Sequence, residues 1–351
     1  MSGFIDFRSD TVTRPTPNMR RAMAECEVGD DVLGDDPTVR HLEELAAEKI
    51  GKAASIFVPS GCMGNLLAMM VHTGGRAGAL VGDASHIWVS ESGAHALVAG
   101  IPARPLPTDR SGRLSERDVL NWCTDDLHLG RTGLFCLENS HNFCGGVVLD
   151  ADYTERVCTP LRAKGIGLHL DGARLFNAAT ALGVKAARLA APFDSVMFCL
   201  SKGLCSPVGS MLCGNRDFIA EARRARKLLG GGLRQAGVLA ACGIISLQEM
   251  TTRLGEDHDN ARFLAEALSP LPGVEIDMQS VQTNMVILGY AGGKDRDVGW
   301  LKGALDDAGV KALVRPAVGG LEERLRLVLH NDVNRQDCER AVEIFRDVVA
   351  N

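Results

Sequence analysis

Three polar clusters each follow a short apolar run, and each contains residues that could take part in catalysis. The last of them is Ser201-Lys202-Gly203, directly after the apolar run 196–200. Lysine is rarely buried, and burial beside positive charge would lower the pKa of its amine and make it nucleophilic. Taken alone, the cluster fits equally well with a lysine that ends a strand and reaches solvent.

The second cluster runs from Asp171 to Arg174, with Asp171 at the end of another apolar run. A carboxylate is costly to bury there without a cationic partner, and a protonated pyridine nitrogen is such a partner. The carboxylate would keep the ring cationic, so that the ring could accept electrons from a substrate carbanion. The alternatives are a surface ion pair between Asp171 and Arg174, or a helix cap.

The first cluster, Ser60-Gly61-Cys62, lies between an expected strand and an expected helix. Glycine lets the backbone approach an anion, and a helix N-terminus offers free N–H groups, so these three residues predict a phosphate cup. An ordinary turn is the alternative. No Walker A lysine follows and the G-x-G-x-x-G spacing is missing, which excludes those two nucleotide-binding motifs and a nicotinamide oxidoreductase built on the second.

The joint occurrence of the clusters favours one shared cofactor over three unrelated features. Ligands of open parallel sheets bind at the carboxyl ends of the strands, where all three clusters are expected. A phosphate cup, a carboxylate for a pyridine nitrogen and a lysine for a Schiff base together predict pyridoxal 5′-phosphate.

A mostly parallel sheet covered by helices is expected to position the clusters, because short apolar runs alternate with amphipathic stretches. One helix is predicted from a cap at Asp36 to a stop at Gly51. Further helices are expected near 65–71, 235–252, 297–308 and 335–349. Strands are predicted at 54–58, 79–81, 133–137, 167–170, 195–200, 210–213, 285–288 and 325–329.

The 351 residues predict a large domain at 1–250, which includes the N-terminal arm, and a small α+β domain at 251–351. Hydrophobic residues make up 46% and charged residues 23% of the chain, as in ordinary globular proteins. The formal net charge of −6 argues against nucleic-acid and anionic-membrane partners.

No apolar run reaches 18 residues, and the N-terminus lacks the features of a signal peptide, so no membrane span and a cytoplasmic location are expected. The 11 cysteines contain no C-x-x-C pair, and many lie in apolar runs. Free thiols and no metal site are therefore expected, with a nucleophilic cysteine as the alternative.

Several segments of the chain resemble the low-specificity L-threonine aldolases, which are pyridoxal phosphate enzymes with the aspartate aminotransferase type of fold. The resemblance covers essentially the whole chain. The matching segments are DFRSDTVTRP at 6–15, GDDV at 29–32, GDDPT at 34–38, ENSHN at 138–142, DGAR at 171–174, LSKG at 200–203, GGGLRQ at 230–235 and RLVLH at 326–330. The resemblance implies an α/β large domain with a mostly parallel seven-stranded sheet flanked by helices, plus the small C-terminal domain.

The resemblance also implies which residues hold the cofactor. Lys202 would carry it as a Schiff base, and Asp171 would pair with the pyridine nitrogen. Arg174 would support the phenolic oxygen and help to bind substrate. The phosphate cup, Ser60 to Cys62, would hold the phosphate, and His86 would stack on the ring.

Substrate recognition follows from the same resemblance. Ser9 and Arg326 would bind the substrate carboxylate, Arg326 as a bidentate clamp. His141 would lie near the β-hydroxyl group, so His86, His141 and Lys202 are the predicted catalytic residues.

Lys227 and Arg234 match family residues that reach the phosphate of a neighbouring subunit's cofactor. They imply a homo-oligomer with a shared active site, and a tetramer is expected.

Two positions depart from the family pattern. Leu33 stands where the family commonly has tyrosine, which removes an aromatic hydroxyl near the mouth of the site and is expected to alter substrate or diastereomer preference. Cys62 stands where the family commonly has threonine, which replaces a good hydrogen-bonding hydroxyl with a weak thiol.

The predicted reaction is retro-aldol cleavage of L-threonine, L-allo-threonine and related β-hydroxy-α-amino acids such as phenylserine to glycine and an aldehyde. The alternatives on the same scaffold are an amino-acid racemase or a β-eliminating lyase. A catalytically silent binding protein with this fold is a third reading, which the intact set of Lys202, Asp171, Arg174 and Arg326 argues against.

Overall fold

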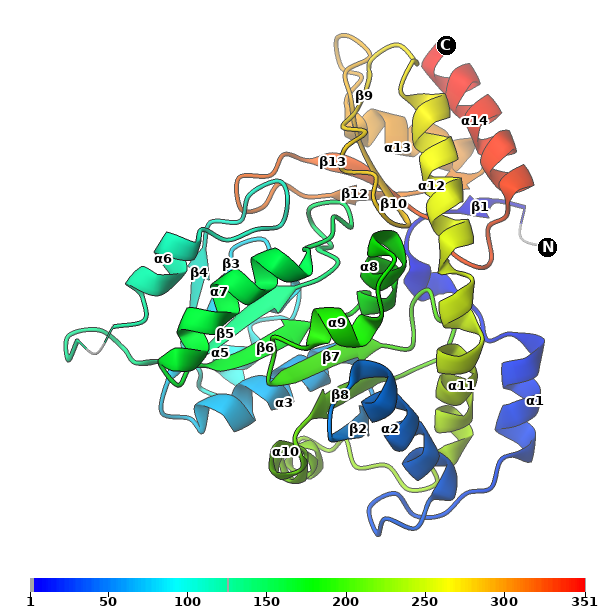
Figure 1. The fold of residues 1–351 in the computed structure, drawn as a ribbon. Helices are drawn as coiled ribbons and strands as arrows, with labels where there is room; N and C mark the ends of the chain where they lie inside the picture. The colour runs from blue at the N-terminus through cyan, green and yellow to red at the C-terminus, as the bar shows by residue number, and fades with distance from the viewer. Residues whose placement is uncertain (1–2, 125, 351) are drawn as a thin grey trace.

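A seven-stranded sheet forms the centre of the larger part of the molecule in the computed structural model, which describes residues 3–124 and 126–350 (Figure 1). β8 runs antiparallel to both of its neighbours and the other pairs are parallel, so the sheet is mostly parallel, as expected. The strand order is β2 (Ala54–Val58), β8 (Ser210–Gly214), β7 (Ser195–Cys199), β6 (Gly167–Asp171), β5 (Thr132–Glu138), β3 (Gly78–Gly82) and β4 (Ala103–Leu106).

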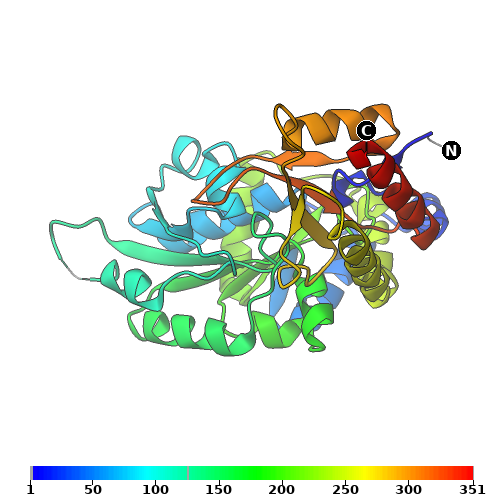
Figure 2. The same cartoon turned by 90° about the horizontal axis from the view of Figure 1, so that it is seen from above.

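Helices cover both faces of this sheet, because successive side chains of each strand point to opposite faces (Figures 1 and 2). In β7, Val196 and Phe198 pack on one face, and Met197 and Cys199 pack on the other. The first face is covered by α2 (Pro37–Ile50), α7 (Ala151–Ala163), α8 (Leu175–Leu182) and α9 (Ala186–Ala190). The second face is covered by α3 (Gly61–Thr73), α10 (Arg216–Leu228), α4 (His86–Val89) and α5 (Ala94–Leu97), whereas α6 (Glu116–Asn121) packs on α7.

The C-terminal part of the chain builds a second core around a four-stranded antiparallel sheet. Its strands are, in order, β12 (Leu313–Arg315), β13 (Arg324–Val328), β10 (Met285–Tyr290) and β9 (Val274–Ile276). Its helices are α12 (Leu254–Leu268), α13 (Val298–Asp307) and α14 (Arg335–Ala350).

The N-terminal strand lies with this second core rather than with the large sheet. β1 (Ile5–Asp6) pairs in parallel with β11 (Val310–Lys311), and Phe7 is fully buried in the second core. The arm therefore crosses between the two parts of the molecule, and the division at residue 250 stays a prediction.

The expected elements are present, but the sequence analysis left out many others, among them β4, β9, α7, α8, α10 and α12. The side chain of Asp36 caps α2, and Gly51 ends it with a φ of 70°. The expected helix at 65–71 begins earlier, at Gly61, and the expected helix at 235–252 divides into α11 (Gly237–Gln248) and a 3-10 turn at Met250–Thr252. β4 was not predicted, because an edge strand that contains Pro105 has a weak strand signature. α12 was not predicted either, because the polar run GEDHDN interrupts its apolar pattern.

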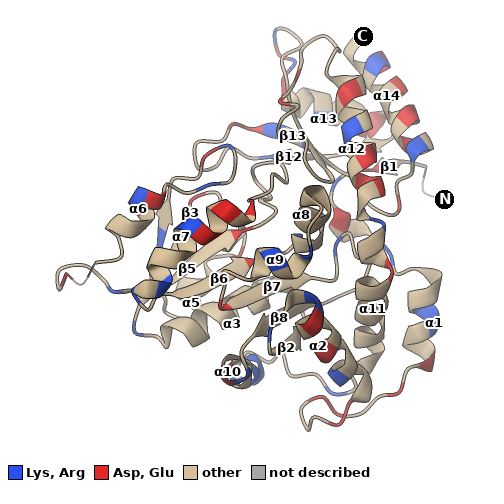
Figure 3. Ribbon diagram, in the orientation of Figure 1, with Lys and Arg blue, Asp and Glu red and all other residues tan. Residues whose placement is uncertain are grey.

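Charge distinguishes the interior helices from the outer ones. Figure 3 shows no Lys, Arg, Asp or Glu on α8 and α11, whereas α12 and α14 carry both signs. α11 packs between α1 (Pro17–Glu25) and α2, so a helix that is apolar all round is buried there. Within the described residues, no helix combines the length and the hydropathy that crossing a membrane requires.

Candidate active site

The carboxyl ends of neighbouring parallel strands bring the polar clusters together. Glu138 ends β5 and pairs in register with Asp171, which ends β6, and Lys202 follows the end of β7 by three residues. The charge of Asp171 raises the pKa of the Cys62 thiol, and the charge of Lys202 lowers it. The phosphate cup is therefore close to the other two clusters. The three clusters therefore share one site at the sheet edge where ligands of such sheets bind.

Asp171 is buried and its carboxylate is held by two donors. Nδ2 of Asn65 donates to Oδ2 at 2.9 Å, and the backbone N–H of Ala173 donates to Oδ1 at 3.0 Å. Asp171 forms no ion pair with Arg174, so the surface-pair alternative is wrong. A carboxylate fixed in this way can accept one more hydrogen bond from a ligand cation.

Arg174 pairs instead with Asp10 of the N-terminal arm. Its Nε and Nη2 donate to the two carboxylate oxygens of Asp10, both at 2.7 Å, and both side chains are almost fully buried. Burial alone would raise the pKa of Asp10, but the charge and hydrogen bonds of Arg174, with smaller contributions from Lys202 and Arg326, hold that pKa well below its ordinary value. The buried pair is therefore ionised, and it ties the arm to the end of β6.

Asp10 was missed by the sequence analysis, although it lies inside one of the matching segments. The available signal was indirect, because a buried arginine requires a counter-ion and Asp171 could not serve both Arg174 and a cofactor.

Arg326 lies beside this pair and shares an acceptor with it. Its Nη1 and the Nη1 of Arg174 donate to the same Oδ1 of Asn142, at 3.1 and 3.2 Å, and its Nη2 donates to the carbonyl of Arg8 at 3.1 Å. Its Nε is buried and has no partner among the described residues. Burial and the charge of Arg174 lower the pKa of Arg326 to about 10, so it stays cationic at neutral pH.

Two guanidinium groups and one balancing carboxylate leave an excess of positive charge at this place. Such an excess suits an anionic ligand, and the unpartnered Nε of Arg326 is available to bind it.

Ser9 and Lys202 also retain free hydrogen-bonding capacity. Oγ of Ser9 accepts from the backbone N–H and from the hydroxyl of Thr11, so its own hydrogen is free to be donated. Nζ of Lys202 makes no hydrogen bond or ion pair with a described residue, although its backbone carbonyl accepts from Oγ1 of Thr13 at 2.9 Å.

His86 is surrounded by carboxylates. Its backbone N–H donates to Glu138 at 2.6 Å, and its Nδ1 lies 2.9 Å from Oε1 of Glu91. Burial would lower the pKa of His86, but the hydrogen bond to Glu91 and the charges of Asp171 and Glu138 outweigh it, so the pKa is raised. Glu91 was not singled out from the sequence. Cys62, His86 and Glu91 also place one metal-ligand atom each within 4.8 Å of the others, a grouping that sequence spacing did not reveal.

The phosphate cup is the N-terminus of α3. Oγ of Ser60 caps the helix by accepting from the N–H of Met63 at 3.2 Å, while the N–H groups of Gly61 and Cys62 make no hydrogen bond with a described residue. A Cβ at Gly61 would lie 3.0 Å from Sγ of Cys199, so the start of α3 packs closely against the end of β7. Burial, with the charges of Glu91 and Asp171, raises the pKa of the Cys62 thiol to about 11, which keeps it protonated.

His141 lies in the loop that follows β5. Its backbone N–H donates to the carbonyl of Val147 at 2.9 Å, and its ring is 2% exposed with no described partner for Nδ1. A buried and unpaired ring nitrogen is costly unless a ligand or water binds it.

Lys227 and Arg234 lie outside this cluster of buried groups. Both are exposed, and Arg234 pairs with Asp30 at 2.9 Å. A Cβ at Gly232 would touch the side chains of both Lys227 and Val32, so these residues form one surface with the loop that carries Leu33. Leu33 is 71% exposed on that loop.

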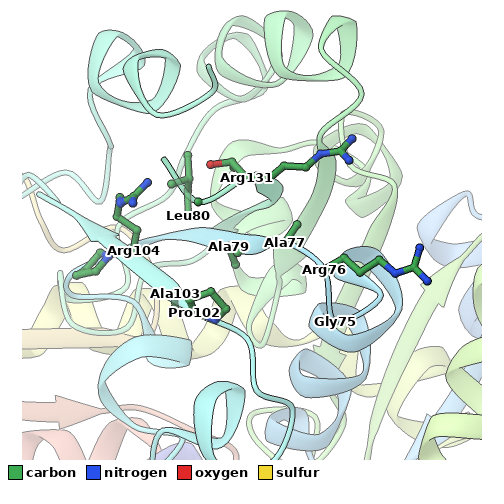
Figure 4. A pocket seen from close by; sticks show the side chains of 13 residues that line it. Gly75, Arg76, Ala77, Ala79, Leu80, Pro102, Ala103, Arg104 and Arg131 are labelled. Carbon is green, nitrogen blue, oxygen red and sulfur yellow. The ribbon is translucent and has the colours of Figure 1, made fainter. Parts of the chain in front are cut away.

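A separate cavity of about 550 Å³ lies at the opposite edge of the sheet (Figure 4). It is lined by the amino ends of β3, β4 and β5 and by the side chains of Arg76, Arg104 and Arg131. None of the predicted site residues lines it.

Comparison with known proteins shows the family of the chain. The family described as Beta-eliminating lyase matches residues 6–290. Low-specificity L-threonine aldolase 1 of Arabidopsis thaliana is 41% identical over 349 residues, which cover 98% of this chain and 96% of the relative. The low specificity L-threonine aldolase of Escherichia coli (strain K12) is 41% identical over 347 residues, which cover 99% of each chain.

Solved structures share the fold at lower identity. The threonine aldolase of Leishmania major matches with a TM-score of 0.84 and 19% identity over 98% of this chain and 99% of that one. A putative L-allo-threonine aldolase from Listeria monocytogenes matches with a TM-score of 0.79 and 21% identity over 97% of both chains. The fold expected from the sequence is confirmed, and the chain belongs to the β-eliminating lyase family and, within it, to the low-specificity L-threonine aldolases.

Proposed function

We propose that this protein is a pyridoxal phosphate-dependent lyase that cleaves L-threonine, L-allo-threonine and related β-hydroxy-α-amino acids to glycine and an aldehyde. The observation that carries the proposal is the meeting of an unpaired lysine, a buried carboxylate and two guanidinium groups at one edge of the sheet. The 41% identity to proteins named low-specificity L-threonine aldolases supports the substrate class.

The residues at the site fit the cofactor. Lys202 offers an amine with no partner, and Asp171 offers a fixed carboxylate for a pyridinium nitrogen. The free amides of Gly61 and Cys62 suit a phosphate. When bound, the cofactor supplies a ring that holds the electron pair released at Cα.

Arg326 and Ser9 are the groups we assign to the substrate carboxylate. Arg326 has an unpartnered Nε, and Ser9 has an unused hydroxyl hydrogen. A carboxylate held by both fixes the rotation about the Cα bonds and so selects which of them breaks. We assign Arg174 to the cofactor's phenolic oxygen, with its position set by Asp10.

His141 is the group we assign to proton transfer. Its imidazole ring can take the proton of the β-hydroxyl group, directly or through a water. Loss of that proton lets the Cα–Cβ bond break, so the aldehyde leaves and Cα gains a proton to give glycine. We assign His86, whose pKa is raised, to a position over the ring, where Glu91 holds its Nδ1.

We further propose a cytoplasmic homotetramer, in which Lys227 and Arg234 would contribute to a site shared between subunits. Both are exposed on the surface that carries Leu33, where they could reach a neighbouring subunit's phosphate.

The test is product analysis with L-threonine, L-allo-threonine, phenylserine and L-alanine. We expect equal amounts of glycine and aldehyde from the first three and no reaction of L-alanine, with Lys202→Ala as the inactive control. The family description favours β-elimination as the second candidate. Ammonia and a 2-oxo acid from threonine would support elimination, D-alanine would support a racemase, and no product with bound cofactor would support a silent binding protein.

A further inference from the structure

A chain of hydrogen bonds runs from Asp171 along the face of the sheet that α3 covers. Asn65 contacts Asp171 at 2.9 Å, and Oδ1 of Asn65 contacts Nε2 of His169 at 3.0 Å. Nδ1 of His169 contacts Oγ of Ser195 at 2.9 Å, and Nε2 of His72 contacts the same Oγ at 2.8 Å. Asn65, His169 and Ser195 are fully buried.

The direction of every bond follows from the chemistry of the groups. A carboxylate only accepts, so Asn65 donates its N–H to Asp171 and turns its oxygen toward His169. His169 must then donate from Nε2, which leaves Nδ1 as an acceptor for the hydroxyl of Ser195. The oxygen of Ser195 in turn accepts from Nε2 of His72.

Both histidines must be neutral for this assignment, and their surroundings make them so. Burial and the neighbouring His72 ring lower the pKa of His169 to about 3. Burial lowers the pKa of His72 to about 4.

We propose that His169, Ser195 and His72 are positioning residues that hold the amide of Asn65 in one orientation and, through it, the carboxylate of Asp171. The proposal deepens the proposed function and rests on it, because Asp171 matters here as the carboxylate for the cofactor's ring nitrogen. If the amide of Asn65 turned over, its oxygen would face the carboxylates of Asp171 and Glu91, and its N–H groups would face the N–H of His169.

The fold explains why the chain has these members. His169 and Asp171 are two residues apart in β6, so both point to the face that α3 covers. Ser195 is the register partner of His169 in β7. Asn65 and His72 are seven residues apart and so lie on one side of α3. The chain thereby fixes the helix that ends in the phosphate cup to the strand that ends in Asp171.

Ser195→Ala and Ser210→Ala form a matched pair of tests. Both serines are fully buried in adjacent central strands, but Oγ of Ser210 has no partner among the described residues. In the cofactor-loaded protein, we expect Ser195→Ala to raise the dissociation constant of the cofactor about tenfold and to shift its visible absorption maximum. Ser210→Ala should change the constant by less than about twofold and leave the maximum in place. Equal effects of the two substitutions would overturn the proposal.

Two substitutions of His72 provide a second test, which applies even if Ser195→Ala folds poorly. His72 is only partly buried, and His72→Gln retains a side-chain N–H near the place of Nε2 whereas His72→Phe does not. We expect the glutamine variant to keep the wild-type absorption maximum and the phenylalanine variant to shift it, and the reverse order would contradict the proposal.

Nitrogen NMR of the full chain shows directly which ring nitrogen of His169 carries the proton, with or without cofactor. We expect His169 to carry its proton on Nε2 and to show an unprotonated Nδ1. A proton on Nδ1, directed at the backbone carbonyl of Ser195, would overturn the relay. Failure of the wild-type protein to bind pyridoxal phosphate would overturn the proposed function instead, because the state of His169 is measured independently of it.

Discussion

The two edges of the central sheet differ in the groups that they gather, and only the amino edge has a sizeable cavity among the described residues. The amino-end cavity of about 550 Å³ is lined by Gly, Ala, Pro and Arg side chains with Leu80 and Thr132, and no carboxylate, histidine or lysine lines it. One of its arginines, Arg104, lies over the ring of Trp122 at 3.6 Å. The carboxyl edge instead gathers Asp171, Arg174 and Lys202 and leaves several polar atoms without a described partner.

The contrast shows that the place of a cavity does not by itself identify the catalytic groups. At the carboxyl edge, buried charges are held by specific partners and some donors are unused, which is costly for stability and typical of a site that binds a ligand. At the amino edge, Arg76 and Arg131 are exposed and Arg104 is half-buried.

The largest expected effect tests which edge carries the chemistry. Lys202→Ala removes the nucleophilic amine and should lower kcat/KM for threonine by about 10⁴-fold or more. Arg131→Ala at the amino-end cavity should leave kcat/KM within about twofold. The measurement is glycine formation, together with the visible absorbance of bound cofactor. Loss of activity in Arg131→Ala comparable with that in Lys202→Ala would break the comparison.

The second prediction concerns the carboxylate that the sequence analysis missed. Asp10→Asn leaves Arg174 buried without a counter-ion and should lower the free energy of unfolding by about 3–5 kcal/mol. Asp6→Asn, four residues earlier in the same arm, breaks a half-exposed pair with Arg8 and should cost less than about 1 kcal/mol. Urea denaturation measures both.

The pH dependence has a defined sign for Asp10. Its pKa in the folded protein lies below the ordinary value of 3.8, so its contribution is fully present above about pH 4 and is lost as the pH falls below that. Asp10→Asn should remove the loss of unfolding free energy that Asp10 causes below about pH 4. If the free energy of unfolding falls with pH in the same way in the variant, the ionised pair with Arg174 is not its cause.

The site was predictable from the sequence where the signal is local. Lys202, Asp171 and the phosphate cup each follow an apolar run closely. The end of a strand and the reactive residue beside it could therefore be predicted from the same short segment. The partners that hold them could not be read this way. Asp10 and Arg174 are 164 positions apart, and Asn65 and Asp171 are 106 apart, so only the folded chain brings them together.

The fold was predictable to a similar degree and for a related reason. Buried central strands are short and apolar, which makes them visible in the sequence, whereas β4 is an edge strand with a proline and only one buried residue. The position of the N-terminal strand depends on its pairing with β11, more than 300 residues away, and no local pattern encodes it.

The third prediction concerns positive charge at the carboxyl edge. Arg326→Ala removes a group assigned to the substrate carboxylate and should raise KM for threonine by about 10- to 100-fold. Arg324→Ala, on the same strand, removes only pairs with the exposed carboxylates of Glu275 and Glu322, so its KM should change less than about twofold. Steady-state kinetics measure both, and equal KM values would remove Arg326 from the site.

The smallest expected effect tests whether a neighbouring subunit completes the carboxyl edge. Leu33 is 71% exposed on the surface shared with Lys227, and Asp30 beside it pairs with Arg234. Leu33→Tyr should change the ratio of kcat/KM for phenylserine and threonine, or for the two threonine diastereomers, by about three- to tenfold. Leu228→Tyr places the same ring on a leucine that is 76% exposed at the end of α10 and should leave the ratios unchanged. If neither variant alters the ratios, Leu33 plays no part in specificity, and the carboxyl edge selects its substrate without this loop.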